Sequence, residues 1–350
     1  MTTFCIEPLV DYPLFSKGLA DALSRLGFPS SFRRVGSRIL SRGLSRLPAR
    51  TFQTTVGSFV NGRILSGPFL ANLHAGDVVV VYATMGLLAD HGRGSFLHRV
   101  KDHGAKLIVL IQDAWPVASS WHSEICDFCE SVSDLVAAVT PSLQELLQRR
   151  YPDRPIALME EAFDTGLFSP DFRENEPVVV WSGPPLKIND VISMIPVLEA
   201  IFKKFHFRLR VVTGSSNPDL KTIVPVDWVP FSSDYRNAFG DATIAFARYK
   251  NDDYGRCKGN YKIKTYLAAG CAIVSNPVGY NHELIKPGIN GLFANTPEEW
   301  EAAFLRLLRN PEERLAMRKA SRELAIRRFS YAAIARQYAD VLAPLIGNQR

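Results

Sequence analysis

The sequence predicts an α/β protein built from two doubly wound domains. Short apolar runs typical of buried parallel strands alternate with helix-like segments in both halves of the chain. The length of 350 residues suits two domains, and 47% apolar residues is enough for a core in each. A polar, proline-bounded segment at 170–177 is the predicted linker. We therefore expect one domain over 1–170, a second over 171–330 and a last helix within 331–350.

The first half contains the alternating elements of one such domain. The expected strands are 3–9, 77–83, 106–113, 133–140 and 155–163. The expected helices are 14–28, a run around 87–103, and 141–151 with Pro141 just inside its start. Ligands of doubly wound sheets bind at the carboxyl ends of the strands. Asp113 follows the strand that begins at 106 and is therefore a candidate site residue.

The second half repeats the pattern. The expected strands are 178–182, 207–214, 241–248 and 271–276. The expected helices are 191–205, a segment near 232–239, 261–269, two amphipathic helices within 296–330, and 331–347. A strand that leads into Gly183, followed by a helix capped by Asn189 or Asp190, is typical of phosphate-binding backbone.

Residues 254–296 carry the strongest indication of function. The segment opens with three cations among two glycines and an asparagine: Arg256, Lys258, Lys262, Gly255, Gly259 and Asn260. The helix Tyr261–Ala269 follows and is ended by Gly270. Glycines let the backbone approach a ligand, and a helix N-terminus offers unpaired N–H groups to an anion. The segment is therefore interpreted as an anion site, with a solvated basic loop as the alternative.

This stretch resembles the donor-binding segment of GT-B glycosyltransferases, closest to the typically retaining family 4, or group 1. The matching elements are Lys262, Tyr266–Val274, Pro277–Gly279, Glu283–Ile285 and Gly288–Phe293. A second match closes the first half: Asp164, Thr165, Phe168 and Pro170. The resemblance implies two Rossmann-like domains that face a cleft, with the C-terminal helix returning to the N-terminal domain. The N-terminal domain would then lie on the acceptor side, and the C-terminal domain would bind the nucleotide sugar.

The activity that the resemblance implies is transfer of a hexose from a nucleotide-diphosphate donor to an acceptor, which is a glycan, a lipid or a small molecule. Lys262 and Lys258 would stabilise the charge that grows on the leaving diphosphate. The donor-binding candidates are Gly183, Lys187, Arg256, Asn260, Thr265 and Glu283. No Asp-x-Asp metal motif is visible, so we expect neither a metal nor a cofactor. An inverting reaction needs a general base, for which Asp113 is the first candidate and His122 the second.

The sequence departs from the family at two positions. The family usually has two glutamates eight residues apart, which hold the donor sugar and the ribose. The matching residues here are Cys257 and Thr265. Two alternatives therefore stay open: a sugar-nucleotide epimerase or hydrolase on the same fold, and a non-catalytic, membrane-associated binding protein. Nucleotide release that requires an acceptor would distinguish a transferase from both.

The basic charge of the chain is local. The net charge is +6, and residues 33–50 hold six arginines and no acid, so the rest of the chain sums to 6 − 6 = 0. Arginines recur every four residues from Arg34, and three leucines lie opposite them on a helical wheel, which predicts a basic amphipathic helix. A solvated loop, an anionic membrane or acceptor patch, and a nucleic-acid site are the three interpretations. No aromatic residues interleave the arginines, so nucleic acid is not the expected partner.

Other features indicate where the protein works. Five cysteines without framework spacing fit a reducing cytoplasm. No apolar run is long enough to span a membrane and no secretory signal is visible, so we expect a cytoplasmic protein, peripheral at the inner membrane face if residues 33–50 bind lipid. Cys126 and Cys129 have no second pair to complete a zinc site and are interpreted as part of a buried helix.

Overall fold

The computed structural model describes residues 2–8, 17–35, 66–83, 88, 90–173, 176–214, 220–231 and 235–346. The chain divides into two compact units. The first unit comprises Met1–Ala162, Asp252–Gly259 and Tyr331–Arg350, and the second comprises Phe163–Asn251 and Asn260–Ser330. The segment 252–259 therefore belongs to the first unit, although its neighbours on both sides in the sequence belong to the second.

The first unit contains a six-stranded parallel sheet in the order β2-β1-β3-β4-β5-β6. Its strands are β1 (Thr3–Pro8), β2 (Ser30–Val35), β3 (Val78–Tyr82), β4 (Lys106–Ile111), β5 (Leu135–Ala138) and β6 (Ile156–Leu158). All five residues of β3 are buried, as expected of a strand that is covered on both faces.

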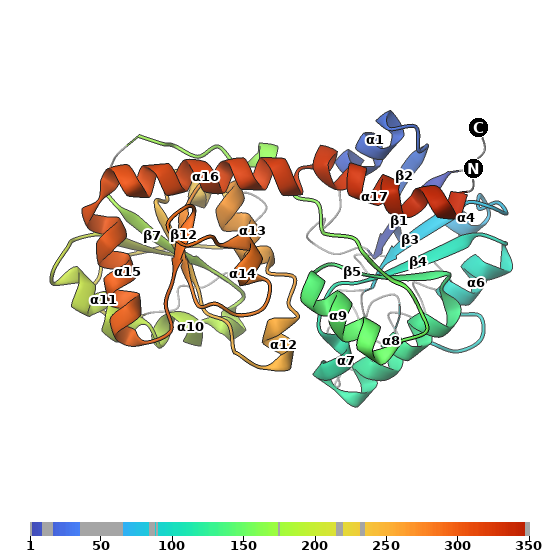
Figure 1. The fold of residues 1–350 in the computed structure, drawn as a ribbon, viewed down its shortest axis with the longest axis horizontal. Helices are drawn as coiled ribbons and strands as arrows, with labels where there is room; N and C mark the ends of the chain where they lie inside the picture. The colour runs from blue at the N-terminus through green and yellow to red at the C-terminus, as the bar shows by residue number, and fades with distance from the viewer. Residues whose placement is uncertain are drawn as a thin grey trace. The chain divides into compact units, whose positions relative to one another are not determined.

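Helices cover this sheet. They are α1 (Lys17–Arg25), α4 (Gly67–Leu70), α6 (Phe96–Asp102), α7 (Trp115–Ala118), α8 (Ser120–Val132), α9 (Pro141–Arg150) and α17 (Tyr331–Ile346). Figure 1 shows α1 and α17 side by side, although they lie at opposite ends of the chain. The hydroxyl groups of Tyr338 on α17 and Tyr82 on β3 lie 3.3 Å apart, which ties the last helix to the centre of the sheet.

The basic segment begins as a strand, so the helix predicted from Arg34 is wrong at its start. Arg33 and Arg34 belong to β2, where Arg34 is the register partner of Glu7 on β1. The spacing of the arginines misled because pairing with β1, and not side-chain periodicity, decides the structure of an edge strand. Residues 36–50 of the predicted helix lie outside the described residues.

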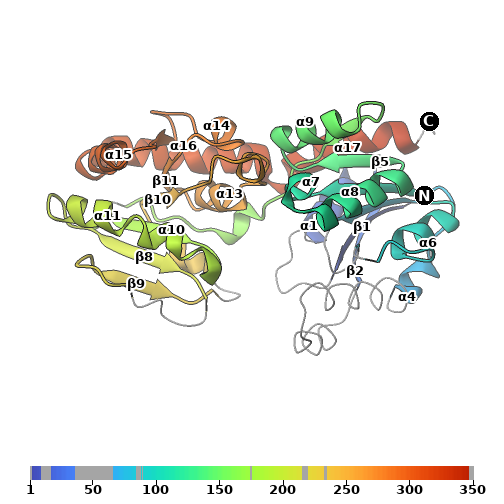
Figure 2. The same cartoon turned by 90° about the horizontal axis from the view of Figure 1, so that it is seen from below.

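The second unit contains a six-stranded parallel sheet in the order β12-β11-β10-β7-β8-β9. Its strands are β7 (Val178–Ser182), β8 (Arg208–Val212), β9 (Val226–Val229), β10 (Ile244–Ala247), β11 (Ala272–Ser275) and β12 (Gly291–Phe293). Figure 2 shows β8 and β9 next to each other in this unit. After β7 the chain adds β8 and β9 on one side of the sheet, and after β10 it adds β11 and β12 on the other side, as in a Rossmann sheet.

The helices of the second half show where helix prediction succeeds and where it fails. They are η2 (Thr165–Leu167), η3 (Pro185–Lys187), α10 (Asn189–Ile192), α11 (Ile195–Phe202), η4 (Tyr235–Phe239), α13 (Tyr261–Ala268), α14 (Asn281–Leu284), α15 (Pro297–Arg309) and α16 (Pro311–Phe329), with α12 (Asp253–Arg256) in the first unit. The helix expected over 191–205 is two helices, because Pro196 occupies the first turn of a new one. The expected caps Asn189 and Asp190 lie inside the first turn of α10, whose N-cap is Ile188.

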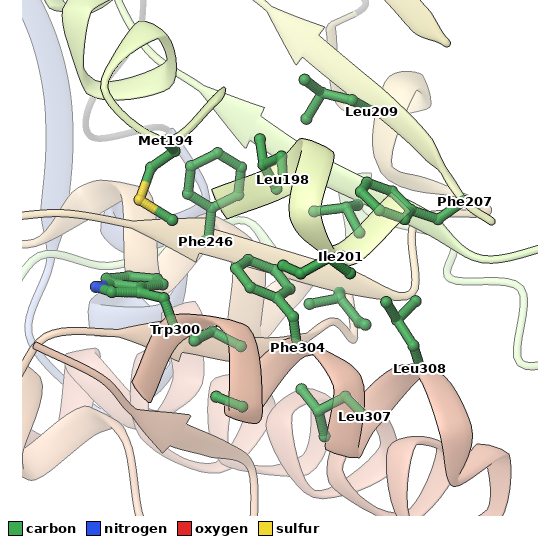
Figure 3. Packing of buried hydrophobic residues seen from close by; sticks show 14 of the residues in the cluster. Met194, Leu198, Ile201, Phe207, Leu209, Phe246, Trp300, Phe304, Leu307 and Leu308 are labelled. Carbon is green, nitrogen blue, oxygen red and sulfur yellow. The ribbon is translucent and has the colours of Figure 1, made fainter. Parts of the chain in front are cut away.

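One hydrophobic core holds the second unit together. Figure 3 shows Met194, Leu198 and Ile201, at the start of α11 and along it, pointing toward Trp300 and Phe304 of α15. Phe246 of β10 lies between them, with its ring 5.9 Å from that of Phe304. This core fixes β10, and therefore the chain that leaves its carboxyl end, against the helical layer.

Cys126 and Cys129 lie on the buried face of α8, so the expected helix with two buried cysteines is confirmed, although the other face of this helix is exposed. Among the described residues, no helix is both long and apolar enough to cross a bilayer.

Candidate functional site

The carboxyl ends of β7 and β10 form the edge of the second unit at which doubly wound sheets bind their ligands. These strands are neighbours, and their connections run in opposite directions, which makes the gap between them the topological switch point. Tyr266 of α13 fixes the helix to this edge, because its hydroxyl accepts hydrogen bonds from Ser182 N at 2.9 Å and Ser182 Oγ at 3.3 Å. Burial raises the pKa of Tyr266, so this hydroxyl stays neutral.

Gly183 is a site of close approach. Its N–H donates to Val212 O, and its carbonyl accepts from Thr213 Oγ1 at 2.7 Å. A Cβ atom at this position would lie 2.7 Å from the indole of Trp181 and 3.4 Å from Lys262 Nζ. The absence of a side chain therefore lets the indole and the lysine occupy the end of β7.

Lys262 places its charge at the same edge. Its Nζ lies 4.5 Å from the centre of the Trp181 ring, a cation–π contact, and its side chain is half-buried. Lys262 is the second residue of α13, so it lies in the first turn, where backbone N–H groups have no partner within the helix. A cation and a helix N-terminus together favour an anionic ligand.

Asn260 forms the start of α13. It has φ 53°, the only positive φ of a non-glycine residue among the described part of the chain, and it is 4% exposed. Its Nδ2 donates to Asn281 Oδ1 at 2.7 Å. Its Oδ1 is buried and has no hydrogen-bond partner among the described residues.

The remaining donor-binding candidates are engaged elsewhere or exposed. Thr265 is 3% exposed, and its hydroxyl donates to Tyr261 O within α13. Glu283 on α14 accepts a hydrogen bond from Arg328 Nη2 at 3.2 Å. Lys187 is exposed on η3, four residues after Gly183. The structure brings Gly183, Lys262 and Asn260 to one edge, while Thr265 serves the helix and Glu283 serves an ion pair.

Asp113 belongs to a cluster in the first unit. It follows β4, and its Oδ2 accepts a hydrogen bond from the Tyr254 hydroxyl at 2.7 Å. Lys258 Nζ lies 3.9 Å from Asp113 Oδ1 and 4.7 Å from the centre of the Tyr254 ring. Burial and the bond to Asp113 raise the pKa of Tyr254, so the phenol stays protonated and remains the donor. This arrangement holds the Asp113 carboxylate in a fixed orientation.

Two other candidates of the first unit, and the departure at Cys257, have local contacts. Arg256 pairs with Asp253 at 2.5 Å, three residues earlier on α12. His122 Nδ1 lies 2.6 Å from Ser119 Oγ at the start of α8, so its ring is tied to a helix cap. Cys257 is 5% exposed, its Sγ contacts Ser142 O, and burial raises the pKa of its thiol.

Comparison with known proteins identifies the fold. Residues 196–340 match the family model described as "Glycosyl transferase-like". A glycosyltransferase from Rickettsia africae ESF-5 superposes with a TM-score of 0.68 at 15% identity, over 99% of each chain. The sucrose-phosphate synthase of Thermosynechococcus elongatus gives 0.66 at 14% identity, over 97% of this chain and 98% of that one. Anabaena Alr3699/HepE, in complex with UDP and glucose, gives 0.66 at 14% identity, over 98% and 99%. The chain has the GT-B fold.

The two Rossmann-like units and the resemblance to GT-B glycosyltransferases are therefore confirmed. The second unit of this GT-B protein carries most of the glycosyl transferase-like region. A search of curated proteins gives no match. Among the described residues, no group of three or more His, Cys, Asp or Glu side chains is placed to hold a metal ion.

Sequence reasoning missed several residues that contact the candidate site residues in the two units of this GT-B protein. Trp181 lies beneath Lys262, Asn281 orients Asn260, and Tyr254 holds Asp113. Lys264 is fully buried, with Nζ 5.1 Å from the centre of the Phe329 ring. Trp181 is an ordinary residue for a buried strand, and Lys264 is an ordinary residue for a helix. Nothing in the sequence therefore distinguishes these two residues. Asn281, a polar residue just after a glycine turn, could have been recognised as a candidate.

Proposed function

We propose that this GT-B protein transfers a sugar from a nucleotide-diphosphate donor to an acceptor. The observation that carries the proposal is Lys262 Nζ, held over Trp181 in the first turn of α13 and 3.4 Å from the position of a Gly183 Cβ. The glycosyl transferase-like match over 196–340 supports it. The UDP and glucose in the Anabaena structure of the same fold indicate the ligand class.

The chemistry follows from charge. As the glycosidic bond breaks, negative charge grows on the diphosphate, so groups fixed in place beforehand stabilise the transition state more than the ground state. Lys262 and the first-turn N–H groups of α13 are the proposed stabilising groups. Gly183 gives the diphosphate access to the backbone, and Lys187 on η3 is a second, exposed cation. Fixed cations perform this task without a metal, so we propose a reaction that needs neither metal nor cofactor.

The roles of Asp113 and Lys258 are also proposals. Asp113 would act as the general base if the reaction inverts configuration, with Tyr254 fixing its orientation. Lys258 lies 3.9 Å from Asp113, which supports a role beside this carboxylate in place of one on the diphosphate. The acceptor would be a glycan, a lipid or a small molecule. The arginines of residues 33–50 are compatible with a peripheral position at an anionic membrane surface.

Nucleotide binding is the first test. Isothermal titration with UDP, GDP, ADP and dTDP should give binding of one nucleotide, and the matching ligand should raise the melting temperature. Release of that nucleotide from its sugar should then depend on an added acceptor. Release without an acceptor would favour the hydrolase alternative. Absence of binding by all four nucleotides would reject the proposal and favour a non-catalytic binding protein.

A further inference from the structure

One buried polar atom at the start of α13, Asn260 Oδ1, has no role in the site described above. The Asn260 side chain is 4% exposed, and this oxygen has no donor among the described residues. A buried amide oxygen without a hydrogen bond destabilises the fold, and native proteins rarely retain one without a reason.

The hydrogen-bond network fixes which way the Asn260 amide points. Asn281 Nδ2 donates to Ser275 Oγ at 3.0 Å and to Asn276 O at 3.0 Å, so only its oxygen faces Asn260. An oxygen needs a donor, so Asn260 must present its Nδ2 to Asn281, at 2.7 Å. Ser275 Oγ in turn donates to Ala247 O at the end of β10. Rotating the Asn260 amide would place two oxygens against each other, so its free group is the carbonyl.

The orphan acceptor lies at a site that otherwise attracts anions. Asn260 immediately precedes α13, and Lys262 follows two residues later at the Gly183 edge. A ligand that satisfies both needs carries an anionic group and a hydrogen-bond donor close to it, and in a nucleotide sugar the donors nearest the diphosphate are hydroxyl groups. Inorganic diphosphate lacks the hydroxyl, whereas a nucleoside diphosphate carries hydroxyls on its ribose and a nucleotide sugar carries more on its sugar.

We infer that Asn260 Oδ1 accepts a hydrogen bond from a hydroxyl group of the bound nucleotide donor, and that the Ser275–Asn281–Asn260 chain orients it for this purpose. The inference rests on the proposed function, because it uses the same anion site. It makes Asn260 a specificity residue that distinguishes hydroxyl-bearing diphosphates from diphosphate alone. A buried water molecule would donate to the same oxygen without any effect on which ligand binds, and the experiment must distinguish this case.

The test compares the wild type with Asn260→Gly by isothermal titration. Glycine keeps the left-handed backbone at φ 53° and removes the oxygen. The control is Asn290→Gly, because Asn290 is 2% exposed in the same unit and its amide is bonded on both sides, to Lys286 N and Leu284 O. The ligands are inorganic diphosphate, the nucleoside diphosphate that binds the wild type, its 2′,3′-dideoxy analogue and the corresponding nucleotide sugar.

Asn260→Gly should bind the hydroxyl-bearing ligand roughly three- to tenfold more weakly, with inorganic diphosphate unchanged and the control variant like the wild type. If the ribose supplies the hydroxyl, the dideoxy analogue should bind the wild type more weakly than the parent nucleotide does, by the same three- to tenfold factor. The variant should then bind the analogue and the parent nucleotide equally well. If the sugar supplies it, only the nucleotide sugar should lose affinity. If Asn260→Gly fails to fold, the wild type alone decides the matter: the dideoxy analogue tests the ribose hydroxyls, deoxy-sugar analogues of the nucleotide sugar test the sugar hydroxyls, and no loss with any of them would overturn the inference.

Two results would overturn the inference in distinguishable ways. Equal affinities of the wild type and Asn260→Gly for every ligand, with no penalty for the missing hydroxyls, would assign the oxygen to a buried water and leave the proposed function intact. Failure of the wild type to bind any nucleotide would reject the proposed function and the inference together.

Discussion

Replacing Lys262 by methionine tests the proposed site most directly. Methionine keeps an unbranched apolar side chain over the Trp181 ring and removes the charge that lies 4.5 Å from its centre. The lost cation–π contact should lower the free energy of unfolding by about 0.5–2 kcal/mol. A charge-assisted hydrogen bond to a diphosphate contributes about 1.5–3 kcal/mol, so the affinity for the nucleotide should fall about ten- to 150-fold.

The assay pairs isothermal titration of the nucleotide with urea denaturation of the same variant. Lys203→Met is the matched control, because Lys203 is exposed at the C-terminal end of α11. This helix leads into the amino end of β8, whereas Lys262 lies near the carboxyl end of β7. It should bind the nucleotide as the wild type does. The reasoning fails if Lys262→Met keeps its affinity within twofold, or if the control loses as much.

Three further substitutions test the surroundings of the site and the first unit. Gly183→Ala places a Cβ 2.7 Å from the indole two residues earlier, so it should cost about 1–3 kcal/mol in urea denaturation and weaken nucleotide binding; wild-type values for both would contradict the close packing. Thr265→Glu puts a carboxylate where only 3% of the residue is exposed, so it should destabilise by about 3 kcal/mol or more, whereas Thr265→Ser should not; a stable, tighter-binding glutamate variant would refute this. A hydrogen bond from Arg150 lowers the pKa of Asp127 from its ordinary 3.8, so Arg150→Met should be less stable than the wild type at neutral pH. The gap should close as the pH falls through that lowered pKa, because protonation removes the pairing; a gap that persists in acid would argue for a packing effect.

The sequence predicted most of the sheets because buried parallel strands are continuous apolar runs. β3 and β4 are almost entirely buried, and so are β7, β10 and β11. β2 escaped notice because it lies at the edge of its sheet and contains Arg33 and Arg34. The helix expected over 191–205 was predicted as one because its apolar residues continue through the break between α10 and α11.

The site was predictable only where its chemistry is local in the sequence. Lys262 and the start of α13 are adjacent, and Gly183 follows a clear strand, so the pattern was enough to propose an anion site there. The hydrogen bond between Tyr254 and Asp113 joins residues 141 positions apart, and no pattern in the sequence predicts it. Glu283 was a candidate by resemblance, but its carboxylate lies beside Arg328, a contact that only the packing of α16 creates.

The two departures from the resembled family acquire a physical meaning from burial. Cys257 and Thr265 are 5% and 3% exposed, and their uncharged thiol and hydroxyl groups contact backbone carbonyls, so neither residue supplies the carboxylate that the family usually has there. Without a carboxylate at position 265, the positive charge of Lys262 and of the N-terminus of the same helix is less opposed, which favours the proposed diphosphate binding. The same loss leaves fewer acceptors for ligand hydroxyls, and the neutral oxygen of Asn260 is an acceptor that remains. Recognition should therefore depend more on charge than on hydroxyl contacts, and nucleotide affinity should weaken as added salt screens the partly exposed lysine.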